Sequence, residues 1–297
     1  MFEGFTLETV ELPEATLRVR HGGSGFPVLL LHGHPRTHTT WHRVAPLLAR
    51  THTVVCPDLR GYGRSSKPAD TPDHRGMSKR ALAEDMVALM NRLGHERFAV
   101  VGHDRGSYVA FRLALDHPER VSHLAFLGLV PIGEALERAN ERFARLWWHW
   151  FFFGQPDKPE RAILADPDAW YGNTAEKRTQ MGEEAYADYS AAVHDPATVH
   201  AMVEDYRAGL GIDREHDTAD RQAGRVLQCP TLVLWPLLDD PEELYDDILA
   251  IWRPWAADLQ GQGLNAGHHV AEEIPEELTA KLLNFLHMSR ADSQPNA

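Results

Sequence analysis

Residues 102–106 read Gly-His-Asp-Arg-Gly and lie between an apolar run, Phe98–Val101, and a helical pattern, Ser107–His117. The apolar run predicts a buried strand, so the five residues predict a sharp turn from strand to helix. Glycine at both ends lets two backbone segments pass close to each other, and the central side chain projects from the edge of the sheet. The pattern therefore predicts that Asp104 faces a ligand.

The residue type at the centre of this turn determines the chemistry that it supports. A carboxylate needs no base to activate it and can form an ester with an electrophilic carbon. The predicted reaction is displacement at carbon rather than acyl transfer. The alternative interpretation is a surface Asp-Arg-Gly turn, which is common when such a pentapeptide stands alone.

The composition excludes several other classes of protein. The chain has 297 residues, 43% of them hydrophobic, which is enough for one large core with an inserted subdomain. Its net charge of −13 opposes binding to nucleic acid or to an anionic membrane surface, because both require basic clusters. No run reaches the length of a membrane span, and the first 15 residues lack the pattern of a secretion signal. With only Cys56 and Cys229, both in apolar contexts, we expect a cytoplasmic protein.

Short apolar runs alternate with amphipathic stretches along most of the chain. After an N-terminal hairpin, Thr6–Val10 with Ala15–Arg20, the predicted strands are Val28–Leu31, Thr53–Cys56, Phe98–Val101, His123–Leu127 and Thr231–Leu234. The predicted crossover and closing helices are Trp41–Ala49, Ser78–Leu93 with Ser78 as N-cap, Ser107–His117 and Pro275–His287. This order predicts an α/β fold with a doubly wound parallel sheet, whose ligand site lies beyond the carboxyl ends of the strands.

The strand signal is absent between residues 131 and 225. The helices predicted there are Glu134–Phe153, Pro159–Leu164, Thr174–Val193 and Thr198–Ala208. We therefore expect a core formed by residues 1–130 and 226–297, and a helical cap formed by residues 131–225 that covers Asp104 and excludes water.

An aspartate nucleophile requires an oxyanion hole, because the ester that it forms must be hydrolysed at its own carbonyl carbon. The sequence His32-Gly33-His34-Pro35 follows the predicted strand Val28–Leu31. The backbone N–H groups of His34 and Arg105 are therefore the candidates for this role.

Hydrolysis of the ester also requires a histidine that activates water, and an acid that orients this histidine. His268 is the candidate base, with His269 second, because His268 directly follows Gly267 after the last predicted strand. The acid is expected after the sixth or the seventh strand. Asp239 is favoured there over Asp240, and the alternative for both is an acidic loop.

Five motifs are spread along the chain: His32–Pro35, Asp58–Ser65, Gly102–Gly106, Trp148–Phe152 and Gly267-His268. Together they resemble the fluoroacetate dehalogenases, a branch of the α/β-hydrolases close to the epoxide hydrolases. The resemblance implies an α/β-hydrolase fold with a mostly parallel eight-stranded sheet and an inserted helical cap. It also implies Asp104 as nucleophile, His268 as base, no metal or organic cofactor, and a homodimer.

In this family the departing halide is bound by residues of the cap, and the resemblance assigns His149, Trp150 and Tyr206 to this role. Three N–H or O–H donors in a dry pocket can replace the water that solvates a small halide. The alternative interpretation of the aromatic run Trp147–Phe153 is ordinary core packing.

Two positions depart from the family's pattern. The relatives bind the substrate carboxylate with two arginines, whereas here Arg105 matches the first and Tyr108 occupies the second, which weakens a bidentate clamp. Arg36 is a further candidate cation, or a surface arginine. Gly128 stands where the relatives carry the acid of the triad. Either Asp239 takes that role from the seventh strand, or the base is poorly oriented and hydrolysis of the ester is slow.

The sequence therefore predicts a hydrolytic dehalogenase that converts short 2-haloacids to 2-hydroxyacids, with a small molecule as its partner. An epoxide hydrolase with the same nucleophile and base is the alternative; it would use Tyr206 and a second phenol from Tyr171, Tyr186 or Tyr189. A haloalkane dehalogenase is disfavoured because Arg105 stands where those enzymes carry tryptophan. The replacement of the acid by Gly128 also allows a non-catalytic binding protein.

Overall fold

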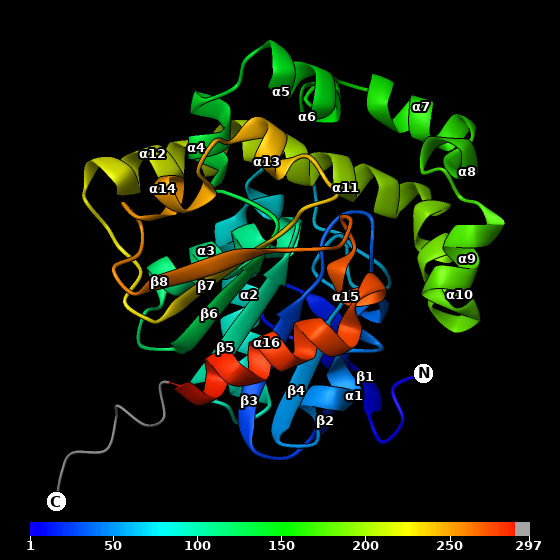
Figure 1. Cartoon of the computed structure of the whole chain (residues 1–297). Helices are drawn as coiled ribbons and strands as arrows, with labels where there is room; N and C mark the ends of the chain where they lie inside the picture. The colour runs from blue at the N-terminus through cyan, green and yellow to red at the C-terminus, as the bar shows by residue number, and fades with distance from the viewer. Residues whose placement is uncertain (289–297) are drawn as a thin grey trace, which may run out of the picture.

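The computed structural model describes residues 1–288, which form one eight-stranded sheet covered by helices (Figure 1). The strand order is β1-β2-β4-β3-β5-β6-β7-β8, and every pair from β4 onward to β8 is parallel. The first two strands pair antiparallel, as the predicted hairpin requires. The predicted α/β class with a mostly parallel sheet is therefore confirmed. The strands are β1 (Thr6–Glu11), β2 (Thr16–Gly23), β3 (Phe26–Leu31), β4 (His52–Pro57), β5 (Phe98–His103), β6 (Val121–Leu127), β7 (Thr231–Pro236) and β8 (Leu259–Leu264).

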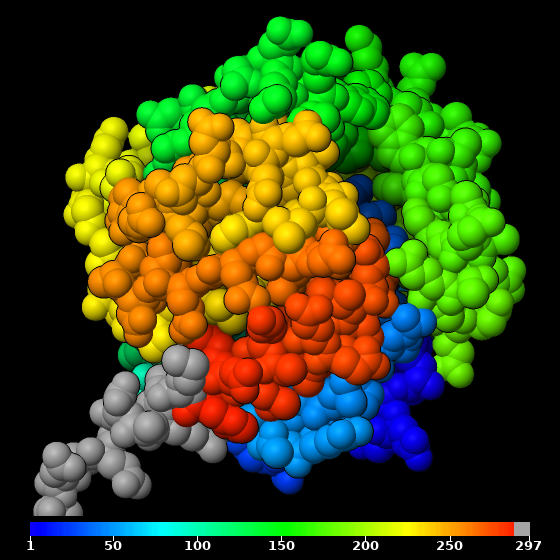
Figure 2. Space-filling model, viewed as in Figure 1, coloured from blue at the N-terminus to red at the C-terminus, as the bar shows by residue number. Residues whose placement is uncertain are grey.

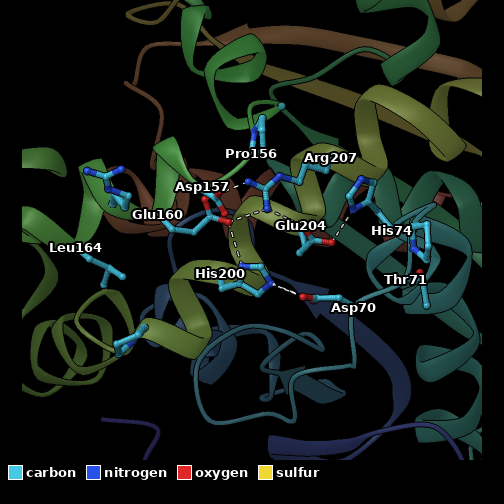
Figure 3. Close-up of a pocket in the computed structure, with 14 residues that line it drawn as sticks. Asp70, Thr71, His74, Pro156, Asp157, Glu160, Leu164, His200, Glu204 and Arg207 are labelled. Atoms are coloured by element: carbon cyan, nitrogen blue, oxygen red, sulfur yellow. Dashed lines mark hydrogen bonds and ion pairs between the residues drawn. The ribbon is translucent and has the colours of Figure 1, made fainter.

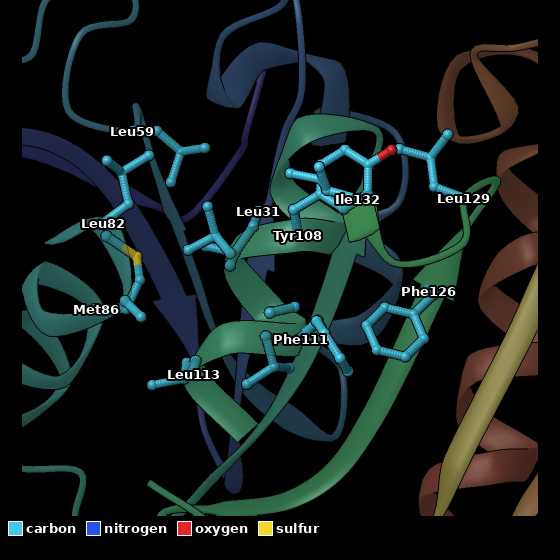
Figure 4. Packing of buried hydrophobic residues seen from close by; sticks show 14 of the residues in the cluster. Leu31, Leu59, Leu82, Met86, Tyr108, Phe111, Leu113, Phe126, Leu129 and Ile132 are labelled. Carbon is cyan, nitrogen blue, oxygen red and sulfur yellow. The ribbon is translucent and has the colours of Figure 1, made fainter. Parts of the chain in front are cut away.

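The strands are continuous apolar runs because both faces of the sheet are buried. On one face, Leu29 and Leu31 of β3 pack in a cluster with residues of two helices behind the sheet, including Leu82 and Leu113 (Figure 4). On the other face, Val28 belongs to a second cluster with residues of the closing helix. Alternate residues of one strand thus supply two separate cores.

Helices lie on both sides of the sheet, with α2 (Lys79–Arg92) and α3 (Arg105–Asp116) behind it and α16 (Pro275–Met288) in front (Figure 1). Ser78 caps α2 as predicted, because its side chain accepts a hydrogen bond from Ala81 N. The helix expected at Trp41–Ala49 is wrong: a 3-10 turn and one short helix replace it, since Pro46 cannot donate the hydrogen bond that a continuous helix needs. The elements of the core are η1 (His38–Trp41), α1 (Ala45–Leu48), η2 (Arg75–Met77), α2 (Lys79–Arg92), α3 (Arg105–Asp116), α13 (Pro241–Leu244), α14 (Ile248–Trp252), α15 (Val270–Glu273) and α16 (Pro275–Met288).

The segment between β6 and β7 is helical, and it covers the top and one side of the molecule (Figures 1 and 2). The long helix expected at Glu134–Phe153 is divided into three. The Asn140 side chain caps a new helix by accepting from Phe143 N, and a second break falls at Trp147, where ψ is +37°. The helix expected at Thr174–Val193 breaks at Gly182, where φ is +83°. The elements are α4 (Ile132–Glu137), α5 (Glu141–Leu146), α6 (Trp148–Phe153), α7 (Lys158–Ala165), α8 (Pro167–Trp170), α9 (Ala175–Met181), α10 (Glu183–Val193), α11 (Pro196–Ala208), η3 (Gly209–Asp213) and α12 (Arg214–Gln222).

Among the helices of residues 1–288, none combines the length and the apolar character that a bilayer span requires.

A network of charges joins α7 and α11 to the loop before α2, beside an open cavity of about 950 Å³ (Figure 3). The His200 ring lies between two carboxylates, with Nε2 3.0 Å from Asp70 Oδ1 and Nδ1 3.0 Å from Glu160 Oε1. Arg207 donates to Glu160 and to Glu204 at 2.7 and 2.8 Å. Because these charged groups pair with one another, we interpret them as a structural network that holds α7 and α11 against the loop before α2. We call this network the brace; its members are Asp70, Glu160, His200, Glu204 and Arg207.

The pH dependence of stability tests this brace. Burial opposes protonation of His200, but its hydrogen bonds with Asp70 and Glu160 outweigh this effect and raise the pKa above 6.5. The stabilisation is therefore complete below the unfolded pKa and is lost as the pH rises through the folded one. We expect His200→Gln to lower the melting temperature more at pH 5.5 than at pH 9.

His216→Gln is the matched control. Burial and the neighbouring arginines lower the pKa of His216, so the trend with pH should have the opposite sign. A His200→Gln deficit that is the same at both pH values would contradict the brace.

Candidate active site

Asp104 stands at the turn between β5 and α3 with φ +48° and ψ −125°. A residue other than glycine rarely adopts this conformation, and such strain is typical of functional sites. A Cβ atom on Gly106 would collide with the carbonyl oxygen of His32, and one on Gly102 with the backbone of Gly106. The two glycines therefore permit the close packing that holds the strained turn at the carboxyl edge of the sheet.

The two oxygens of the Asp104 carboxylate have different surroundings: Oδ1 accepts a backbone hydrogen bond, whereas Oδ2 faces His268. The backbone N–H of His34 donates to Oδ1 at 2.6 Å. Gly33 is glycine because a Cβ atom there would collide with the same oxygen. His34, predicted from sequence for the oxyanion hole, thus lies at the carboxylate, whereas the role of the Arg105 N–H stays a prediction.

His268 faces Asp104 and is oriented by Asp239. Its Nε2 lies 4.0 Å from Asp104 Oδ2, and its Nδ1 lies 2.8 Å from Asp239 Oδ2. Burial lowers the pKa of His268, whereas the hydrogen bond to Asp239 and the charge of Asp104 raise it. The second effect is the larger, so the pKa lies above 6.5. Burial lowers the pKa of His269 well below 6.5, and its Nδ1 has no hydrogen-bond partner among the described residues. The geometry favours His268 over His269 as the base.

The choice between the two aspartates after β7 follows from their contacts. Asp239 contacts the histidine, whereas Asp240 accepts a hydrogen bond from Trp147 Nε1 at 3.2 Å. At the end of β6, Gly128 has φ +101°, a conformation that a side-chain-bearing residue rarely adopts. The acid contacting the histidine therefore comes from the loop after β7.

These residues line a cavity of about 180 Å³. Ligand pockets usually measure about 300–1,000 Å³, so the space favours a substrate of few atoms. The lining residues are His34, Asp104, Gly128, Leu129, Leu146, Trp147, His149, Trp150, Tyr206, Asp239, Asp240 and His268.

The three residues that the family resemblance assigns to halide binding meet in this cavity. His149 and Trp150 come from α6 and Tyr206 from α11, and the Tyr206 ring centroid lies 5.7 Å and 6.1 Å from theirs. Burial lowers the pKa of His149 to about 4 and raises that of Tyr206 well above 10. At neutral pH the site thus contains a neutral imidazole and a protonated phenol.

Arg105 and Tyr108 lie next to this cavity and are absent from its lining. The Arg105 guanidinium donates to Asp205 Oδ1 through Nε and Nη2, at 3.1 and 2.5 Å, and stacks 4.2 Å from the Tyr206 ring centroid. Arg105 Nη1 and the Tyr108 hydroxyl are buried without a hydrogen-bond partner among the described residues. Arg36 is also buried, in a bidentate pair with Glu272, so it is not a surface arginine.

Sequence analysis missed Asp205, a fully buried carboxylate beside Tyr206. It accepts from Arg105, from Lys79 and, at 2.6 Å, from the Tyr62 hydroxyl. Burial would raise the pKa of Asp205, but the two cations lower it. Its partners are 100 to 143 residues away in the chain, so no local pattern indicates the cluster.

Comparisons with known proteins agree with this geometry. Residues 27–235 match the family model of the alpha/beta hydrolase fold. The chain is 42% identical to a fluoroacetate dehalogenase from Burkholderia sp., over 98% of this chain and 97% of that protein. The chain belongs to the fluoroacetate dehalogenase family of α/β-hydrolases.

Other members of this superfamily are also similar. The chain is 32% identical to a soluble epoxide hydrolase from Corynebacterium sp. (strain C12), over 89% of this chain and 91% of that one. A crystal structure from Nostoc sp. PCC 7120, provisionally described as an α/β-hydrolase, has a TM-score of 0.93 and 45% identity, and covers 97% of this chain and 100% of its own. The family assignment and the fold are thus supported along the whole chain.

The Asp205 cluster yields a prediction on stability. Asp205→Ala leaves Arg105 buried without its counter-charge and removes one of the two carboxylates that pair with Lys79, the other being Asp213; breaking a buried pair in this way typically costs about 3–5 kcal/mol. Urea unfolding measures this loss. The exposed Asp246→Ala control should change the free energy of unfolding by less than about 0.5 kcal/mol, and an equal effect of both variants would contradict the structural role of Asp205.

Proposed function

We propose that this enzyme is a hydrolytic dehalogenase that converts short 2-haloacids such as haloacetate to 2-hydroxyacids through an ester on Asp104. The observation that carries the proposal is the pairing of the Asp104 carboxylate with His268, oriented by Asp239, in a cavity of about 180 Å³ lined by three cap donors. The 42% identity to a fluoroacetate dehalogenase supports the same reaction class.

In the first step, Asp104 displaces the halide. Oδ1 is held by the His34 N–H, so Oδ2 is the oxygen available for attack on the α-carbon. The bond from Oδ2 to carbon forms as the carbon–halogen bond breaks, and the halide leaves with the bonding electrons. His149, Trp150 and Tyr206 donate hydrogen bonds to the departing anion, which favours the transition state over the bound substrate.

In the second step, water hydrolyses the ester. His268 Nε2 takes a proton from water, whose oxygen attacks the Asp104 carboxyl carbon. The negative charge develops on Oδ1, where the His34 N–H and, as the sequence predicts, the Arg105 N–H stabilise it. The bond between the Asp104 carboxyl carbon and Oδ2 then breaks, and Oδ2 leaves on the substrate carbon. It takes the proton from His268 to complete the 2-hydroxyacid, and Asp104 retains one oxygen from water. Side chains and backbone supply every group that these steps need, so the proposal includes no metal or organic cofactor.

Arg105 and Tyr108 are proposed to bind the substrate carboxylate. Arg105 Nη1 and the Tyr108 hydroxyl are buried donors without a partner among the described residues, and the guanidinium carbon lies 5.2 Å from the Tyr108 ring centroid. Because Asp205 already neutralises Arg105, we expect weaker carboxylate binding than a two-arginine clamp would give.

Trapping of the ester tests the proposal. His268→Asn removes the base of the second step and leaves the nucleophile in place, so the ester should accumulate. After incubation with chloroacetate, mass spectrometry should find a carboxymethyl adduct on the peptide that contains Asp104. The matched His268→Asn/Asp104→Asn double variant should carry none, and a folded His268→Asn protein without the adduct would overturn the proposal.

An epoxide hydrolase is the second candidate, favoured by the Tyr206 hydroxyl in the cavity and by the epoxide hydrolase relative. Attack of the carboxylate opens the epoxide ring and produces an alkoxide, and a second phenol is needed beside Tyr206 to protonate it. Tyr171, Tyr186 and Tyr189, the sequence candidates, are absent from the described lining of the cavity. The higher identity to the fluoroacetate dehalogenase than to the soluble epoxide hydrolase, 42% against 32%, favours dehalogenation. Parallel assays of chloroacetate and styrene oxide distinguish the two reactions.

The remaining expectations concern the domains, the cellular location and the oligomeric state of the enzyme. We propose that residues 131–225 act as the cap and the described part of 1–130 and 226–297 as the core; residues 289–297 lie outside the described structure. A cytoplasmic location and a homodimer stay predictions from the sequence, which cell fractionation and light scattering would check.

A further inference from the structure

Three histidines lie together on one side of the nucleophile: His103, which directly precedes it, and the neighbours His268 and His269. Their ring centroids are 5.1, 5.9 and 4.9 Å apart, and one ring nitrogen of each lies within 4.8 Å of the other two. We propose that this cluster binds a divalent transition metal such as Zn²⁺, and that the metal inhibits the enzyme.

The spacing of the rings suits such an ion. Zinc binds imidazole nitrogen at about 2.0–2.1 Å in tetrahedral sites, which places ligand rings with their centroids about 5 Å apart. The three observed separations lie near this value. The ligand nitrogens, which lie within 4.8 Å of one another, reach tetrahedral spacing by rotation of the side chains.

Free nitrogen atoms in the cluster support the proposal. His103 Nε2 lies 2.7 Å from the carbonyl oxygen of His268, which can only accept, so Nε2 carries the proton and Nδ1 has the lone pair. That Nδ1 is buried and has no hydrogen-bond partner among the described residues, and the same holds for Nδ1 of His269. A buried polar atom without a partner is costly, and a metal ion would relieve that cost.

The outer contacts of two of these rings are typical of metal ligands. Histidines that bind metals usually donate their second nitrogen to a carboxylate or a backbone carbonyl, which fixes the ring. His268 Nδ1 contacts Asp239, and His103 Nε2 contacts a backbone carbonyl. Each of these two rings thus has such an outer contact on one of its nitrogens.

A second cluster within residues 1–288, formed by His38, Asp58 and Asp188, has similar ligand spacing, but its carboxylates already pair with an arginine. The Arg18 guanidinium lies 2.5 Å from Asp188 and 3.7 Å from Asp58, and so already supplies the positive charge. This cluster is the natural comparison for the histidine site.

Coordination of His268 would block hydrolysis of the ester, a consequence that rests on the proposed function. Its Nε2 is the atom that activates water, and its Nδ1 is held by Asp239, so a metal on either nitrogen removes a required interaction. The metal is not a cofactor here. The sequence predicted no metal site, and this proposal departs from that expectation.

Calorimetry with zinc chloride and no substrate tests the site independently of the reaction. We expect one zinc ion per chain for the unmodified protein, and affinity at least about tenfold weaker for His269→Gln and for His103→Gln. Asp188→Asn, which removes a ligand from the other cluster, should bind zinc as the unmodified protein does. Circular dichroism confirms that each variant is folded, and two ligand variants keep the test valid if one of them is not.

Three results would overturn the proposal: no zinc binding at micromolar concentration, equal affinity in both histidine variants and the unmodified protein, or loss of binding in Asp188→Asn alone. Inhibition is tested separately by halide release. Zinc should slow chloroacetate turnover and a chelator should restore it, whereas zinc binding without inhibition would refute the inhibitory role only. Because calorimetry needs no substrate, failure of the proposed function would leave the binding result intact.

Discussion

The strained backbone at Asp104 is the constraint on which the rest of the site depends. A side-chain-bearing residue at φ +48° costs free energy, and the surrounding packing must hold it. Gly102 and Gly106 make this possible by letting α3 approach β5 and β3 more closely than any side chain would allow. As a result the carboxylate projects beyond the sheet, where the loops after β3, β7 and β8 bring His34, Asp239 and His268 to it.

A second constraint joins the helices between β6 and β7 to this turn. Asp205 binds Arg105, the residue after the nucleophile, and precedes Tyr206 in α11. One buried carboxylate thus fixes α3, which begins at Arg105, and the proposed halide donor Tyr206 relative to each other. The same contact neutralises the cation proposed for the substrate, so the position of the donor and the strength of carboxylate binding are coupled.

Local patterns predicted the fold and several candidate site residues, since strands, caps and the Gly-His-Asp-Arg-Gly turn are encoded by adjacent residues. The candidates His149, Trp150 and Tyr206 came from the family resemblance. The sequence already favoured Asp239 over Asp240, and the structure adds the contacts that separate them, since Asp239 contacts His268 and Asp240 contacts Trp147. Asp205 and the histidine cluster could not be predicted, because their partners are distant in the chain. Helix boundaries failed where a single residue, such as Asn140 or Gly182, begins or ends a helix.

The most direct measurement of the central claim is a single turnover in water labelled with ¹⁸O, with enzyme in excess over haloacetate. If water attacks the Asp104 carboxyl carbon, the label enters the Asp104 side chain, and the 2-hydroxyacid carries an unlabelled oxygen from the protein. Mass spectrometry measures the ¹⁸O content of the peptide that contains Asp104 and of the product. Label in the product and none in Asp104 would contradict the account, because water would then attack the substrate directly.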